Sequence, residues 1–250
     1  TLNLRINNFD VPQSIARGTS IWLHCNFDLE GDELYSVKWY KNYVEFYRYL
    51  PSNKPKSGQI FRLNGIYVDS CNVFSSHLLQ LSLSNATHVF LSTIDIDSEG
   101  TFACEVSTEG PSFTTLKAER QMKVFVLPKE ELLIEGSEFS YSSENLVNLT
   151  CIASASYPPQ ILTWKINEQK ALNHQLVHYS LESINGSDLK SVKLGLMFYV
   201  TSNYFNKGIL RLQCVSELIL FYKFENYRSL IGGTPKNTST NGHYTWSKGQ

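Results

Sequence analysis

Cysteine is the residue type in this sequence with the most obvious chemistry, and its spacing forms a repeat. The five cysteines stand at positions 25, 71, 104, 151 and 214. Trp39 follows Cys25 by 14 residues and precedes Cys104. The second half of the chain repeats this order, with Trp164 placed 13 residues after Cys151 and before Cys214. Cysteines that form disulfides are typical of proteins that fold in an oxidising compartment.

The repeated order of cysteine, tryptophan and cysteine is the mark of immunoglobulin-like domains. In such domains the two cysteines join strands of opposite sheets, and the tryptophan packs on that bridge. The repeat therefore predicts two intradomain disulfides, Cys25–Cys104 and Cys151–Cys214, with Trp39 and Trp164 in the two cores. Phe102 replaces the tyrosine that usually stands two residues before the second cysteine, and we assign Phe102 to the core as well.

Cys71 is left over, because it belongs to neither predicted disulfide. One interpretation is an intermolecular disulfide or a reactive thiol. We favour the other, a free and largely buried thiol, because unpaired cysteine is among the most buried residue types.

The remaining patterns that carry chemistry are weak. His174 and His178 have the spacing of two metal ligands on one face of a helix, but their segment is predicted to be β and lacks the glutamate of a zinc protease motif. We find no glycine-rich phosphate loop, no paired CxxC zinc signature and no recognisable Ser-His-Asp frame in the sequence. We therefore predict that the protein is not an enzyme and has no catalytic residues, no metal and no cofactor.

Four asparagine sequons predict N-glycosylation and, with it, an extracellular location. The predicted sites are Asn85, Asn148, Asn185 and Asn237. The chain begins with Thr1 instead of Met, so we expect that an upstream segment, such as a signal peptide, has been removed. The prediction is a secreted or cell-surface-anchored protein, whose membrane anchor, if it has one, lies beyond Gln250.

Composition agrees with a folded protein that binds other proteins. Hydrophobic residues make up 42% of the chain and charged residues 18%, which is enough apolar material for proper cores. The formal net charge is -1, and no run of Lys or Arg is longer than two. The basic face that nucleic acid requires is therefore not visible. We predict neither a nucleic-acid partner nor a small-molecule substrate.

The elements that must position these residues are β-strands, because inward and outward positions alternate around each anchor. Positions 21, 23, 25 and 27 share one face of a strand, positions 37 and 39 one face of a second, and positions 102, 104 and 106 one face of a third. The predicted fold class is all-β, with two tandem immunoglobulin-like β-sandwich domains.

The distances between the anchors differ in the two domains. Trp39 and Cys104 are 65 residues apart, whereas Trp164 and Cys214 are 50 apart. The longer spacing accommodates an added C′–C″ hairpin, so we predict a variable-type first domain and a constant- or intermediate-type second domain. The domains are placed at residues 1–127 and 128–231. Residues 232–250 are rich in Gly, Ser, Thr, Asn and Pro, which predicts a flexible stalk or tail.

Short motifs in both domains occur together in one known family. They are Val37-Lys38-Trp39-Tyr40, Glu45-Phe46-Tyr47-Arg48-Tyr49, Phe102-Ala103-Cys104-Glu105-Val106-Ser107, Gly110-Pro111-Ser112-Phe113 and Leu210-Arg211-Leu212-Gln213-Cys214. With these motifs the sequence resembles the Beaten path (Beat) family of arthropod immunoglobulin-domain neuronal guidance proteins, over about residues 10–222 and most strongly in the first domain. The resemblance implies a role in axon guidance, defasciculation or synaptic partner choice. It also implies that the first domain binds Sidestep-family receptors of the immunoglobulin superfamily.

Alternation around Trp39 and Cys104 predicts a partner-binding face on the GFCC′ sheet of the first domain. Both anchors must point inward, so their neighbours at 38, 40 and 105 must point outward. If Phe46 points inward, Tyr47 lies outward beside Tyr40, and Tyr49 follows on the same face. The predicted interface comprises Lys38, Tyr40, Tyr47, Tyr49, Glu105 and Phe113. Tyrosines surrounded by charged residues are typical of protein interfaces.

Two other functions agree with the same domains. The chain could be a homophilic cell-adhesion module, or a soluble decoy that binds a ligand.

Asn85 is expected on the sheet opposite the predicted interface, so that its sugar leaves the interface free.

Overall fold

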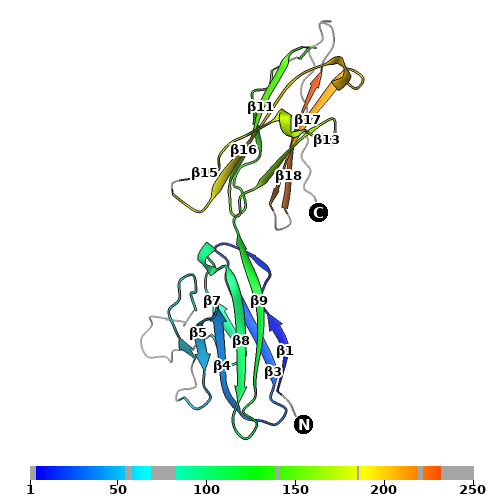
Figure 1. Ribbon diagram of the computed structural model, residues 1–250. Coiled ribbons are helices and arrows are strands. Elements are labelled where there is room, and N and C mark those ends of the chain that lie inside the picture. Colours follow the sequence, from blue (N-terminus) through cyan, green and yellow to red (C-terminus); the bar gives the residue numbers. More distant parts are fainter. Residues whose placement is uncertain are drawn as a thin grey trace. The chain divides into compact units, whose positions relative to one another are not determined.

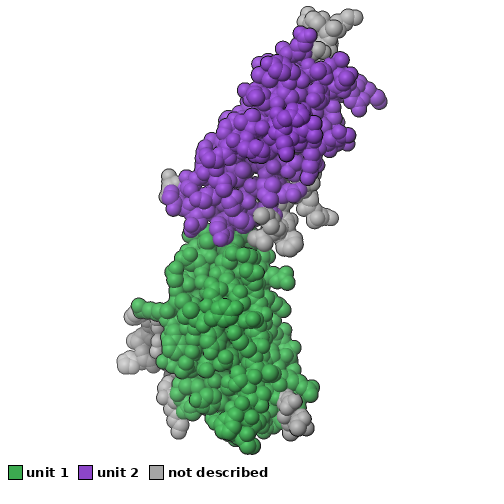
Figure 2. Space-filling model, in the orientation of Figure 1, with its two compact units in different colours: residues 1–125 green, residues 126–250 purple. Residues whose placement is uncertain are grey.

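The structure is a computed structural model, and in the residues that it describes the regular elements are β-strands apart from three short 3-10 helices. It describes residues 4–53, 58–68, 83–138, 141–142, 144–184, 186–218 and, for the backbone alone, 222–231. The chain divides into two compact units, Thr1–Phe125 and Val126–Gln250 (Figure 2), two residues before the predicted boundary. Within the described residues, no helix has both the length and the apolar character that crossing a bilayer requires.

The described residues of unit 1 form two sheets, which Figure 1 shows in blue to green. The three-stranded sheet has the order β1 (Arg5–Asp10), β3 (Ile21–Asp28), β7 (His88–Leu91). The six-stranded sheet has the order β2 (Ser14–Ala16), β9 (Thr115–Phe125), β8 (Gly100–Thr108), β4 (Leu34–Lys41), β5 (Val44–Tyr49), β6 (Gln59–Ile60). Neighbouring strands are antiparallel, except that β2 and β9 are parallel.

The core of unit 1 is built from the inward positions of both sheets. Cys25 of β3 and Cys104 of β8 form the predicted disulfide, and both are buried. Trp39 of β4 and Phe102 of β8 lie in the same buried cluster. The alternation of inward and outward residues predicted from the sequence therefore holds on β3, β4 and β8, where it surrounds the disulfide.

The turn that leads into β8 is held by Ser98 and Lys41 in place of the missing tyrosine hydroxyl. Ser98 ends a short 3-10 helix, η1 (Ile96–Ser98). Its Oγ accepts a hydrogen bond from the Asp95 amide at 2.8 Å and donates to the Gly65 carbonyl at 2.6 Å. The buried Lys41 Nζ donates to the Asp97 carbonyl of the same turn. These bonds satisfy buried polar groups that would otherwise destabilise the corner.

In unit 2, too, the strands that the structure describes form two sheets (Figure 1). The five-stranded sheet has the order β10 (Leu133–Glu135), β11 (Leu146–Ser156), β16 (Lys190–Tyr199), β14 (Leu176–His178), and β15 (Glu182–Ser183) also pairs with β16. The four-stranded sheet has the order β13 (Gln169–Lys170), β12 (Ile161–Ile166), β17 (Ile209–Leu218), β18 (Tyr222–Ile231). Two further 3-10 helices, η2 (Asn173–Gln175) and η3 (Ser202–Tyr204), lie in connecting segments.

The core of unit 2 repeats the arrangement of unit 1. Cys151 of β11 and Cys214 of β17 form the second predicted disulfide between the two sheets. Trp164 of β12 is buried beside it, and its indole Nε1 donates a hydrogen bond to the Leu194 carbonyl at 2.8 Å. A disulfide between facing sheets with a buried tryptophan against it is the immunoglobulin-like arrangement. The predicted fold, two tandem immunoglobulin-like β-sandwiches, is therefore confirmed.

Several predicted features lie outside the described residues. These are Cys71, Asn185, Asn237 and the tail at residues 232–250. The sequon asparagine Asn148 lies inside β11 with its side chain exposed. The strand begins two residues earlier, at Leu146, because β11 pairs with β16 along that whole length.

Candidate recognition surface on unit 1

The outward face of the six-stranded sheet carries two rows of side chains that run across the strands. In the first row, Arg48 of β5, Lys38 of β4, Glu105 of β8 and Lys117 of β9 lie side by side through successive strand pairing. Three of the four side chains in this first row are cationic. Because residues that are paired across strands have neighbouring Cβ atoms, each member lies within reach of the next.

The second row lies beside the first and has the opposite charge. It comprises Glu45 of β5, Tyr40 of β4, Ala103 of β8 and Glu119 of β9, again in register across the strands. Ala103 is only 3% exposed although it alternates with the inward Phe102 and Cys104. The small alanine side chain is therefore covered by the side chains around it.

Glu105 connects the two rows. Its Oε1 accepts a hydrogen bond from Lys38 Nζ at 3.2 Å and another from the Tyr40 hydroxyl at 3.2 Å. Burial of the Tyr40 phenol, together with the charges of Glu105 and Glu45, raises the pKa of Tyr40 to about 12. Tyr40 is therefore a neutral hydrogen-bond donor at physiological pH, held in one orientation by Glu105.

Lys117, at the β9 end of the first row, adds cation–π contacts to the face. Its Nζ lies 5.8 Å from the centroid of the Tyr40 ring and 5.2 Å from that of Tyr43. Tyr43 belongs to the turn between β4 and β5, has a φ of 67° and is 76% exposed. Lys117 also forms an ion pair with Glu119 at 3.4 Å. Together these contacts place an ammonium group over two aromatic rings, a favourable arrangement.

A bidentate ion pair borders the face on β5. Arg48 Nε and Nη2 donate to the two carboxylate oxygens of Glu45 at 2.6 and 2.7 Å. The Arg48 guanidinium also lies 5.5 Å from the centroid of the Phe61 ring. Bidentate pairing orients a guanidinium more firmly than a single contact does.

Two of the predicted interface residues point the wrong way. Tyr47 is 0% exposed, and its hydroxyl donates to the Asn85 carbonyl at 3.2 Å. Tyr49 is paired with the buried Val37 and packs against the core. The predictions for Tyr47 and Tyr49 as partner-binding residues are therefore wrong.

The physical reason for this error is a β-bulge in β5. Pairing runs from Trp39–Tyr47 directly to Tyr40–Glu45, so that Phe46 is an extra residue on β5. A bulge breaks the strict alternation of a strand. Phe46 and Tyr47 consequently both point inward, and the outward positions fall on Glu45 and Arg48 instead.

Of the other four predicted interface residues, three lie on the outward face of the sheet and one lies in a loop. Lys38, Tyr40 and Glu105 lie together in the network described above. Phe113 lies in the loop between β8 and β9, with a φ of 47° and an exposure of 77%. Sequence reasoning missed Lys117 and Glu119, although their alternation along β9 would have revealed them.

In the described part of the chain, no cluster of three or more His, Cys, Asp or Glu side chains that could hold a metal ion occurs. His174 lies in η2 and His178 in β14, so the two do not share a helix face.

Comparison with known proteins establishes the fold. No protein-family model and no curated protein sequence matches the chain. Among solved structures, murine CEACAM1b is similar over 92% of this chain and 100% of its own, with 14% sequence identity and a TM-score of 0.53. Rst D1-D2 is similar over 92% of this chain and 98% of its own, with 12% identity and a TM-score of 0.51. At these identities the similarity shows the fold alone: the chain has a two-domain immunoglobulin-like architecture.

Proposed function

We propose that this chain is an extracellular recognition protein that binds another protein through the outward face of the six-stranded sheet in unit 1. Both units contain a disulfide, which favours an oxidising compartment. Asn85 and Asn148 are exposed sequon asparagines, which supports passage through the secretory pathway.

The single observation that carries the proposal is the Tyr40–Glu105 network at the centre of this face. A tyrosine orients its ring under Lys117 while its hydroxyl is held by Glu105. Interfaces favour such rigid aromatic anchors within a polar rim, because little conformational entropy is lost when they bind. The preformed charge pairs supply complementarity to a polar partner surface.

The partner class rests on the sequence resemblance. The motifs shared with the Beaten path family include Lys38 and Tyr40, which lie at the centre of this face, and Arg48 at its edge. We therefore propose a Sidestep-type receptor of the immunoglobulin superfamily as the partner. The associated process would be axon guidance, defasciculation or synaptic partner choice.

A binding experiment tests this proposal. Immobilised Sidestep-type ectodomains should bind the secreted chain, and Tyr40→Ala should weaken the affinity by about 2 kcal/mol or more, roughly 30-fold. Tyr199→Ala is the matched control, because Tyr199 is an exposed strand tyrosine of unit 2. Urea unfolding must show that both variants are folded. Equal binding by wild type, Tyr40→Ala and the control would place the interface elsewhere.

Homophilic adhesion is the second candidate, and the charges of the two rows favour it. Consider a two-fold axis that lies in the plane of the face, parallel to the rows and between them. Such an axis sets Arg48 of one copy opposite Glu45 of the other, and Lys117 opposite Glu119. Isologous interfaces need this kind of self-complementarity. Analytical ultracentrifugation separates the candidates, since a salt-sensitive dimer supports homophilic adhesion and a monomer at all concentrations excludes it.

A further inference from the structure

The outward face of the other sheet of unit 1 carries a cluster of aromatic and imidazole rings. Trp22 of β3 is paired with Phe90 of β7, and His24 of β3 with His88 of β7. The centroid of the Trp22 ring lies 4.7 Å from that of Phe90 and 5.1 Å from that of His88. Trp22 is 40% exposed. We call these four residues the ring cluster.

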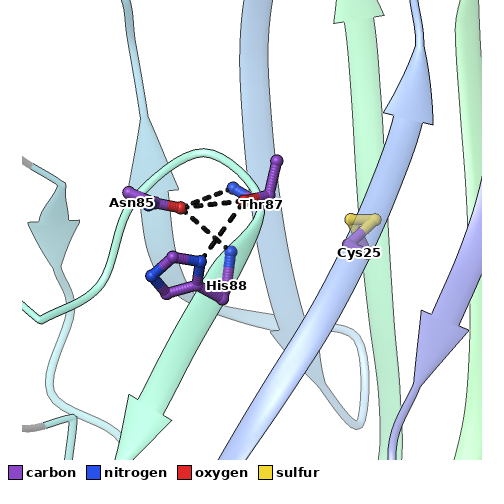
Figure 3. The surroundings of a disulfide bond; sticks show 5 residues. Cys25, Asn85, Thr87 and His88 are labelled. Atoms are coloured by element: carbon purple, nitrogen blue, oxygen red, sulfur yellow. Dashed lines mark hydrogen bonds between the residues drawn. A yellow bond between two sulfur atoms is a disulfide. The ribbon is translucent and has the colours of Figure 1, made fainter.

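A sequon is hydrogen-bonded directly to this cluster (Figure 3). Asn85 Oδ1 accepts from the Thr87 amide at 2.8 Å, from the Thr87 hydroxyl at 3.1 Å and from the His88 amide at 3.1 Å. The Thr87 hydroxyl lies 3.3 Å from Nδ1 of the His88 ring. The Thr87 carbonyl in turn accepts from the Cys25 amide of β3 at 2.8 Å, which ties this turn to the sheet.

The geometry leaves the acceptor atom of glycosylation free. Asn85 is exposed, and its Oδ1 is the atom that the turn uses. Within the part of the chain that the structure describes, its amide nitrogen Nδ2 makes no hydrogen bond. Nδ2 is the atom that carries an N-linked sugar, so the turn holds the sequon without occupying it.

We propose that Asn85 carries an N-linked oligosaccharide whose first sugars lie on the ring cluster, with Trp22 as the main platform. The aliphatic C–H face of a pyranose is weakly positive, and the face of an aromatic ring is negative, so the two attract each other. The carboxamide of Asn85 accepts from the backbone amide of His88 and from the Thr87 hydroxyl, which lies 3.3 Å from Nδ1 of the His88 ring. The centroid of the Trp22 ring is 5.1 Å from that of His88. The sugar would thus cover apolar surface that otherwise faces water.

Neighbouring groups favour a neutral surface under the sugar. Burial, and secondarily the charge of His24, lowers the pKa of His88 below its ordinary value. The His88 imidazole is therefore uncharged at physiological pH. An uncharged sugar is better matched to this surface than an ionic partner would be.

A simpler interpretation is that the ring cluster only stabilises the sheet. Cross-strand aromatic pairs contribute to sheet stability without any ligand. The two interpretations differ in one measurable respect. If the sugar lies on the ring cluster, the contribution of Trp22 to the stability of unit 1 depends on the sugar at Asn85, whereas in the simpler interpretation it does not.

A double-mutant cycle measures this dependence. The full chain is secreted from animal cells as wild type, Asn85→Asp, Trp22→Ala and the double variant. Aspartate keeps the Oδ1 acceptor of the turn but cannot be glycosylated. Asn85→Asp should lower the thermal midpoint of unit 1 by roughly 2–5 °C in the wild-type background and should have almost no effect in the Trp22→Ala background.

Two controls make the result decisive. Wild type and Asn85→Asp are also made without glycosylation. The difference between their thermal midpoints is the effect of the substitution itself, and it is subtracted. Phe113→Ala removes another exposed aromatic of unit 1, and it should show no coupling to Asn85→Asp. Glycopeptide mass spectrometry gives the occupancy of Asn85. An unoccupied Asn85, or an equal effect of Asn85→Asp with and without Trp22, overturns the proposal.

Discussion

Replacing Tyr47 by alanine should destabilise unit 1, and any loss of binding should follow from that loss of folded protein. The Tyr47 side chain is fully buried, and its hydroxyl donates to the Asn85 carbonyl. Removing a buried aromatic side chain costs about 3–5 kcal/mol, a large fraction of the roughly 5–15 kcal/mol that stabilises a whole domain. Tyr47→Phe removes only the hydrogen bond, which corresponds to about 0.5–1.5 kcal/mol.

Urea unfolding followed by tryptophan fluorescence gives the free energies, and binding is measured on the same samples. Tyr47→Ala should shift the unfolding midpoint strongly, and Tyr47→Phe should shift it slightly. Affinity per folded molecule should stay near that of wild type for both Tyr47 variants. Tyr40→Ala should instead keep an unfolding midpoint near that of wild type and lose affinity. A Tyr47→Ala protein with wild-type stability and weakened binding would refute the inward placement of this side chain.

Four further predictions concern the cores and the Glu105 network. Trp164→Phe should destabilise its unit more than Trp39→Phe does, by about 1 kcal/mol or more in urea unfolding, because Trp164 bonds the Leu194 carbonyl whereas the buried Trp39 Nε1 has no partner in the described structure. Glu105→Gln should lower the pKa of Tyr40 from about 12 toward its ordinary value of 10. In an alkaline titration the phenolate absorbance of this variant should therefore rise at a lower pH than that of wild type. The raised pKa also means that the contribution of Tyr40 to stability is complete below pH 10 and is lost as the pH rises toward 12. Replacing both cysteines of either disulfide by alanine should lower the stability of that unit by about 2–5 kcal/mol, and equal urea midpoints for variant and wild type would contradict this.

The sequence by itself determined the features that depend on local periodicity and covalent chemistry. The Cys–Trp–Cys repeat predicted both disulfides and both buried tryptophans. In immunoglobulin-like domains the two cysteines of such a repeat join strands of opposite sheets, and the tryptophan packs on the bridge. Alternation around Trp39 and Cys104 also placed Lys38, Tyr40 and Glu105 on one outward face. A strand with regular alternation has only two faces, so one known inward residue assigns all the others.

Tertiary structure alone decided the features that depend on how distant strands meet. The β5 bulge at Phe46 has no signal in the local sequence, since it arises where β5 pairs with β4, and it turned Tyr47 and Tyr49 inward. The register of β8 against β4 brought one Glu105 oxygen within reach of two donors. The register of β3 against β7 likewise set Trp22 beside His88, next to a sequon more than sixty residues away. Strand register is a property of the packed sheet, because it is selected by which faces can be buried together.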